Sequence, residues 1–355
     1  MTNIVRFAIA CSMLPCNVHA FTLSSMKNTR TTPIIQDIQN LESSRTKKDL
    51  SIERWYRDQG VIGTSCINLC TSEKSVAGRG LFWNCKKDAQ KGEILAFVPS
   101  KCIATKSNLI QNYPSLQSME NENSNVSISW QAKLTTYVNH CLGNPNDCEN
   151  RKEWIQSWSG GGPGSPKPAS TYSSDEIEHI AAVADVAEDI AREAIDSRYE
   201  TYMNDWNSVT AYNKDANASE RFGDLYSIIL SRTASLGPEW EYQRGIIPFH
   251  DMINHPPLHQ LPNIELFSFG HVREQIGYVH TCDMIRTLAK NEFDAGVRKD
   301  FYQYSEPQDG DILLVAREKI IKGDEIWLSY KNHKENFDAR ERIWLLLQYG
   351  FPFHK

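Results

Sequence analysis

The sequence predicts an α+β fold in which short β-strands and small sheets are split by a helical insert. Two observations lead to this prediction. Short apolar runs separated by glycine turns, the pattern of small strands, occupy residues 67–105 and return beyond Gly245. Between them lies an insert at about 106–221, in which apolar residues from Ile177 to Ala191 recur every three or four positions, which is the spacing of a helix.

The first 48 residues predict a targeting leader. Residues 1–20 have the features of a cleaved signal peptide, because Arg6 precedes an apolar stretch and small residues end at Ala20. Residues 21–48 are predicted to be disordered and resemble a transit peptide, since hydroxyl and basic residues dominate and no acid precedes Asp37. Together they indicate a plastid protein that enters by the secretory route. A plain secreted protein is the alternative.

The folded part is expected to run from residue 49 to residue 355 as one domain with the insert inside it. Residues 49–58 carry apolar and aromatic side chains at helical spacing and predict a short helix. Residues 94–98 form an apolar run that ends at a proline, which predicts a strand.

The insert contains a flexible connector rich in glycine and proline at 160–168, followed by a helical pattern with an acidic start at Ser174. Strands are expected again within 309–315 and 323–328, and a helix at 338–348 closes the domain.

Composition excludes several classes of protein. With 38 Lys and Arg against 44 Asp and Glu, the chain lacks the basic character of a nucleic-acid-binding protein. After the leader no apolar run is long enough to span a membrane, so no membrane association is expected. The seven cysteines that follow the leader are odd in number and form no C-x-x-C pair, which argues against a disulfide framework and a zinc cluster. The oligomeric state is left open.

Four patches far apart in the sequence carry candidate chemistry. The glycines around Arg79 let the backbone approach a ligand closely. Arg232 follows a predicted helix at 222–230, and a guanidinium fork suits a carboxylate. The patches are Ala77-Gly78-Arg79-Gly80-Leu81-Phe82, Ser231-Arg232, Pro248-Phe249-His250-Asp251-Met252-Ile253-Asn254-His255, and Gly323 to Tyr330 with the later string Tyr349-Gly350-Phe351.

In this order the four patches resemble the motifs of SET-domain protein methyltransferases, in particular the branch typified by the ribulose bisphosphate carboxylase large-subunit lysine methyltransferase. The resemblance covers about residues 64–353. It implies a SET fold, S-adenosylmethionine as cofactor, no metal, and a lysine side chain of a non-histone, plastid protein as methyl acceptor. The roles it implies are catalytic for Tyr330, cofactor-binding for Ala77, Gly78, Arg79, Arg232, Asn254 and His255, and substrate-binding for Asp251, Tyr349 and Phe351.

Other interpretations stay open. His250, Asp251 and His255 could instead be metal ligands. A SET-like binding module without catalysis is a second alternative, because Lys331 and Ala77 depart from the family pattern. A third is methylation of a histidine or of a protein N-terminus. The family branch carries a helical substrate-docking domain after its Tyr-Gly-Phe string, and the sequence is expected to lack it because four residues follow Phe351.

Overall fold

The computed structural model describes residues 46–71, 79–105, 128–143, 151–158, 165–210, 219–237, 243–256, 260–294, 296–297, 306–329 and 337–349. The predicted signal peptide and nearly all of the transit-like segment lie outside these residues.

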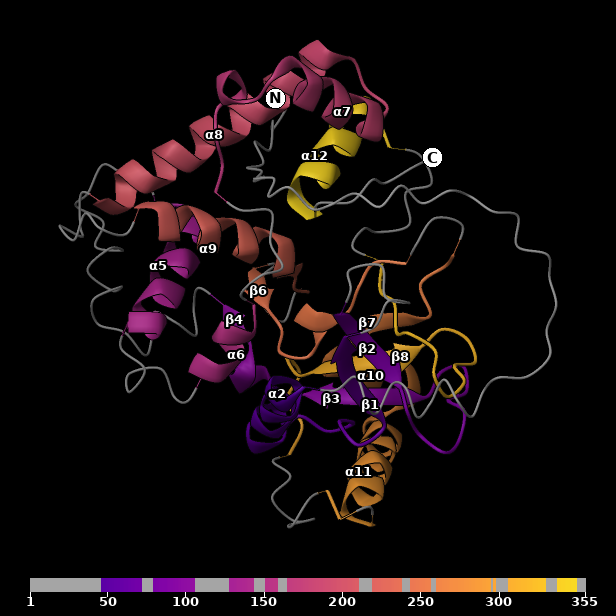
Figure 1. The fold of residues 1–355 in the computed structure, drawn as a ribbon. Helices are drawn as coiled ribbons and strands as arrows, with labels where there is room; N and C mark the ends of the chain where they lie inside the picture. The colour runs from indigo at the N-terminus through magenta and orange to yellow at the C-terminus, as the bar shows by residue number, and fades with distance from the viewer. Residues whose placement is uncertain are drawn as a thin grey trace.

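The described chain consists of helices and short strands (Figure 1). The helices are α2 (Lys47–Asp58), α5 (Trp130–Gly143), α6 (Lys152–Ser157), α7 (Ser174–Ala184), α8 (Glu188–Thr210), α9 (Ser219–Arg232), α10 (Phe269–Ile276), α11 (Tyr278–Asp294) and α12 (Ala339–Tyr349), with 3-10 turns η1 (Ser100–Cys102), η3 (Ala169–Thr171) and η6 (His250–Met252). The strands are β1 (Ile67–Thr71), β2 (Arg79–Trp83), β3 (Ile94–Val98), β4 (Ala104–Thr105), β5 (Ala234–Ser235), β6 (Arg244–Ile246), β7 (Ile264–Ser268) and β8 (Ile312–Ala316).

The strands form small antiparallel sheets in the orders β1-β2, β3-β8-β7 and β4-β6-β5. Apolar pairs such as Leu69 with Leu81 and Phe97 with Leu313 set the register of the first two sheets. These four side chains are buried, so a slip of one residue would turn apolar side chains away from the core. The predicted α+β class is confirmed.

The segment 320–328 joins two distant parts of the strand-rich unit. On one side Phe82 forms an antiparallel bridge with Glu325, and on the other Asn254 forms a parallel bridge with Trp327. The Ile326 amide donates to the carbonyl of Leu81 at 2.8 Å. Consequently the first, third and fourth sequence patches lie side by side.

The alanine-rich part of the insert forms two helices. The apolar spacing continues from Ile177 to Ala191, but α7 ends at Asp185, whose φ of 53° is left-handed. Arg342 of α12 donates to the carbonyls of Ala184 and Asp185, which satisfies the end of α7. Together α7, α8 and α12 pack around a hydrophobic cluster and form one layer, at the top of Figure 1.

The stretch between residues 256 and 309, for which the sequence indicated no element, contains β7, α10 and α11. Buried side chains of α10 and α11, including Phe269 and Ile285, pack against Phe97 of β3 and Leu313 of β8. The helices α2, α5 and α9 cover other parts of the strands and share the largest cluster of buried side chains. The sheets are thus enclosed by helices from several sides (Figure 1).

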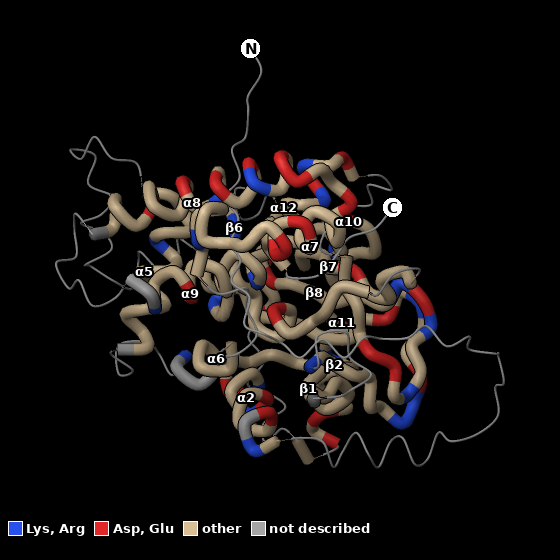
Figure 2. The backbone as a smooth tube through the Cα atoms, turned by 45° about the horizontal axis from the view of Figure 1, so that its top comes forward, with Lys and Arg blue, Asp and Glu red and all other residues tan. Residues whose placement is uncertain are grey.

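Acidic and basic residues alternate over the surface, with Asp and Glu frequent along α7 and α8 (Figure 2). None of the helices in the described chain is long and apolar enough to cross a membrane. Cys141 is disulfide-bonded, whereas the described Cys66, Cys70, Cys85, Cys102 and Cys282 form no disulfide.

Candidate functional site

A cavity of about 1000 Å³ lies between the α8–α12 layer and the sheets. Residues of α8 and α12 form one wall, and residues of β5, β6 and β7 form the other. Three of the four sequence patches contribute to it. The lining residues from those patches are Ser231, Arg232, His250, Asp251, Leu328, Ser329 and Tyr349.

Asp251 is the buried acid of this cavity, with 7% of its surface exposed. Its Oδ2 accepts hydrogen bonds from the indole nitrogens of Trp154 at 2.9 Å and Trp158 at 2.8 Å. Among the described residues, no group donates a hydrogen bond to Oδ1. Burial raises the pKa of Asp251, while the charge of Arg232 and the two indole hydrogen bonds lower it.

A strained turn places Asp251 in the cavity. The preceding Phe249 has a φ of 75°, a conformation rare for a bulky residue, and is fully buried with an edge-to-face contact to Tyr56. The turn η6 follows at once, and its residue Asp251 donates its backbone amide to the carbonyl of Ile247 at 3.0 Å. The strain is therefore located directly before the functional candidate.

Arg232 is the last residue of α9, which is longer at both ends than the predicted helix. Its Nη1 donates to the backbone carbonyl of Asp251 at 2.6 Å. Its Nε is buried and has no hydrogen-bond partner among the described residues. A guanidinium that lines a cavity with a free donor can accept an anionic ligand group such as a carboxylate.

Asn254 bridges Arg79 and Glu325 beside Gly80. The Asn254 amide nitrogen donates to the carbonyl of Arg79 and to Oε1 of Glu325, both at 2.7 Å. A Cβ on residue 80 would lie 2.3 Å from that Oε1 and 2.8 Å from the amide nitrogen. A side chain at residue 80 would therefore require the ends of the Glu325 and Asn254 side chains to shift.

Arg79 and His255 are fixed by contacts with the protein. The Arg79 guanidinium forms an ion pair with Asp49 at 2.5 Å and donates to the carbonyl of Ser157 at 3.2 Å. Burial lowers the pKa of His255 to about 4, and burial lowers that of His250 to about 4 as well. Both imidazoles are therefore neutral at physiological pH.

The metal-ligand interpretation receives no support from the described part of the chain. There, no group of three or more His, Cys, Asp or Glu side chains is placed to hold a metal ion.

Tyr349 and Arg244 also line the cavity and interact electrostatically with each other. Burial raises the pKa of Tyr349 to about 12, so its hydroxyl stays protonated at physiological pH. Arg244 of β6, which the sequence analysis did not single out, lines the same cavity, and burial lowers its pKa. No local motif marks Arg244, because only the pairing of β6 with β5 brings it here.

The structure thus brings Arg232, Asp251 and Tyr349 together in one cavity. Arg79, Asn254 and His255 lie outside its lining, and Asn254 joins Arg79 to Glu325. Four further candidates lie outside the described residues, namely Ala77, Gly78, Tyr330 and Phe351.

Comparison with known proteins identifies a fold class. Three similar solved structures are the SET domain of LSMT bound to lysine and AdoHcy (TM-score 0.51, 12% identity), Rubisco LSMT bound to AdoMet (0.51, 11%), and Rubisco LSMT bound to sinefungin and monomethyllysine (0.52, 13%). The matches cover 86%, 87% and 87% of this chain, and the chain spans 57% of the length of each of these structures.

The described architecture is therefore a SET-like fold. At this level of identity the likeness extends to the fold, and within that class the particular fold is similar to that of Rubisco LSMT. No protein-family model and no curated protein matches the sequence.

Proposed function

We propose that the chain is an S-adenosylmethionine-dependent protein methyltransferase whose acceptor is a lysine side chain. The observation that carries this proposal is the convergence of Arg232, Asp251 and Tyr349 on one cavity. These residues come from three separate sequence patches, and the similar structures have AdoMet, AdoHcy or lysine bound.

The residues present fit the cofactor. Arg232 offers a buried Nε without a partner among the described residues, and a carboxylate is the group that a guanidinium binds best. In this proposal Arg232 holds the carboxylate of S-adenosylmethionine. The proposal extends cofactor binding to Ala77, Gly78, Arg79, Asn254 and His255, of which Arg79, Asn254 and His255 lie outside the cavity lining. When bound, the cofactor supplies an electrophilic methyl group on a sulfonium.

The protein then has to orient the amine and exclude water. Alignment of two reactants is worth roughly 7–11 kcal/mol. A lysine amine must also be neutral, and deprotonation at pH 7.5 from a pKa of about 10.4 costs on the order of 4 kcal/mol. An aromatic, water-poor channel lowers that cost by disfavouring the charged form.

In the proposal Tyr330 orients the amine, while Tyr349 and Phe351 wall the channel. Tyr349 does not serve as a general base, since its pKa of about 12 keeps its hydroxyl protonated. In the same proposal Asp251 binds the substrate.

The test is incubation of the purified chain with methyl-labelled S-adenosylmethionine and a plastid protein extract. Transfer of label to the lysine of one discrete protein, and its loss in Arg232→Ala, is expected. Cofactor binding without any transfer would replace this proposal by that of a binding module. Label on histidine or on an N-terminus would correct the acceptor.

We also propose a plastid location, on the strength of the leader sequence. Residues 1–48 fused to a fluorescent protein should direct it to the plastid of an alga whose plastid lies inside the endomembrane system. Fluorescence in the medium would instead support secretion.

A further inference from the structure

Two tryptophans of the helical insert reach the buried acid of the cavity. Trp154 belongs to α6 and Trp158 follows it directly, and each donates its indole N–H to Oδ2 of Asp251. All three side chains are buried, and the partners are 97 and 93 residues apart in sequence. The insert thus contacts the acid through specific hydrogen bonds.

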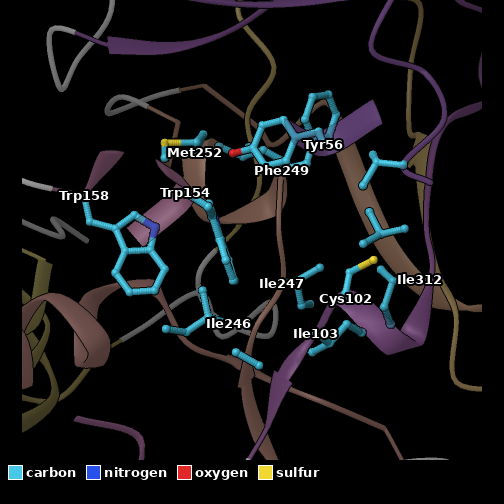
Figure 3. Close-up of a cluster of buried hydrophobic side chains, with 14 of the residues drawn as sticks. Tyr56, Cys102, Ile103, Trp154, Trp158, Ile246, Ile247, Phe249, Met252 and Ile312 are labelled. Atoms are coloured by element: carbon cyan, nitrogen blue, oxygen red, sulfur yellow. The ribbon is translucent and has the colours of Figure 1, made fainter. Parts of the chain in front are cut away.

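The indoles are held in fixed orientations. Trp55 of α2 stacks on Trp154 with ring centroids 5.0 Å apart and an interplanar angle of 13°. Trp158 meets Trp154 edge to face at 5.1 Å and 79°. Figure 3 shows both indoles in the buried cluster that also contains Tyr56, Phe249 and Met252. Such packing leaves the N–H groups little freedom to turn away.

These contacts stabilise the carboxylate without neutralising it. The charged neighbours are Arg232 on α9, which donates to the backbone carbonyl of Asp251, and Arg79 on β2, which pairs with Asp49. The buried Tyr56 on α2 and the neutral His250 carry no charge at physiological pH. Indole donors are neutral, so the negative charge of Asp251 remains available to a ligand.

We propose that Trp154 and Trp158 are positioning residues that hold Asp251 ionised and oriented, so that its Oδ1 receives a protonated primary amine in the cavity. The inference rests on the proposed function only for the source of that amine, which is either the amino-acid end of the cofactor or the substrate lysine as it arrives, before it loses its proton. Burial of an unpaired carboxylate is costly, and a cationic amine would offset that cost.

The experiment measures binding by calorimetry with two probes, AdoHcy and free lysine, on the full chain. The variants are Trp154→Phe, Trp158→Phe and the double variant, which remove N–H groups and keep aromatic rings. Trp83→Phe is the matched control, because its indole donates to the carbonyl of Lys87 outside the cavity lining.

We expect the double variant to bind one of the two probes at least tenfold more weakly. The probe that loses affinity identifies the source of the amine. As the pH is lowered, binding of that probe should be lost at a higher pH than in the wild type. Loss of the indole hydrogen bonds raises the pKa of Asp251 further, so its carboxylate becomes protonated earlier in the descent. The Trp83→Phe variant should keep the wild-type affinity and pH profile.

A role in packing alone would lower the melting temperature and leave the pH profile in place. Wild-type affinities and pH profiles for both probes in folded Trp158→Phe and Trp154→Phe would overturn the proposal. If the double variant does not fold, the single variants decide. Because binding is read without turnover, absence of methyl transfer would count against the proposed function and leave this test intact.

Discussion

The amide nitrogen of Asn254 lies 2.7 Å from Oε1 of Glu325, and the pair passes directly over Gly80. Asn254 also binds the carbonyl of Arg79, so one side chain connects three patches of the sequence. At Gly80 the glycine-rich segment is therefore in close contact with two side chains of the protein.

Gly80→Ala should destabilise the fold by about 1–3 kcal/mol, the usual cost of forcing extra atoms into a packed site. The added Cβ would displace both Oε1 of Glu325 and the amide of Asn254. Chemical denaturation measures the change. The double variant with Asn254→Ala should lose less than the sum of the two single effects, since both break the same bridge. Strict additivity would contradict this account.

Asn254→Ala should lower both stability and cofactor affinity. It removes two hydrogen bonds and leaves the buried Glu325 with one donor fewer, a loss of about 1–3 kcal/mol in free energy of unfolding. Calorimetry with AdoHcy on the folded protein separates the binding effect. Wild-type affinity there would show that Asn254 is structural and remote from the cofactor.

Arg232→Lys should weaken AdoHcy binding by about tenfold or more, because an ammonium cannot hold a carboxylate with two parallel hydrogen bonds. Arg286→Lys is the control, since that arginine is exposed on α11 and pairs with Asp283. Equal affinities of the two variants would remove the carboxylate role from Arg232.

Tyr330→Phe should reduce turnover at least tenfold and change cofactor affinity little, because the hydroxyl is proposed to orient the amine in the reacting complex. Tyr278→Phe on the exposed start of α11 serves as the control. Unchanged turnover of Tyr330→Phe on a lysine substrate would refute the assignment.

His250 should make the fold sensitive to acid. Its pKa is lowered to about 4 from an ordinary value near 6.5, so its contribution to stability is full above pH 6.5 and is lost as the pH falls toward 4. The shift corresponds to roughly 3 kcal/mol. Denaturation between pH 7.5 and 4 should show a shallower decline in His250→Leu. The comparison with wild type is needed because the raised pKa of Asp251 acts in the opposite direction.

Local patterns predicted much of the fold. The helix at 49–58 is present as α2, where Thr46 and Asp49 form a capping box, and the apolar run at 94–98 is β3. The break between α7 and α8 could not be predicted from spacing, because the periodicity runs through Asp185. That break is stabilised by Arg342, 157 residues away.

The same distinction between local patterns and contacts distant in sequence applies to the candidate site. Arg232, Asp251 and Tyr349 were found through motifs, and the structure places them in one cavity. Trp154, Trp158 and Arg244 belong to no motif, and each reaches the site through a tertiary contact that spacing does not encode. The helices α10 and α11 lie in the stretch from 256 to 309, for which no element was predicted.

Residues 320–328 pair with two segments that are synthesised earlier, and this sets an order of events during synthesis. The bridge that joins Arg79, Asn254 and Glu325 spans 175 residues on one side and 71 on the other. It cannot form until residue 325 has left the ribosome, however early the first strands are made. Contacts of such sequence separation form slowly. A nascent chain therefore carries Arg79 and Asn254 without their link to Glu325 until the segment 320–328 has been made.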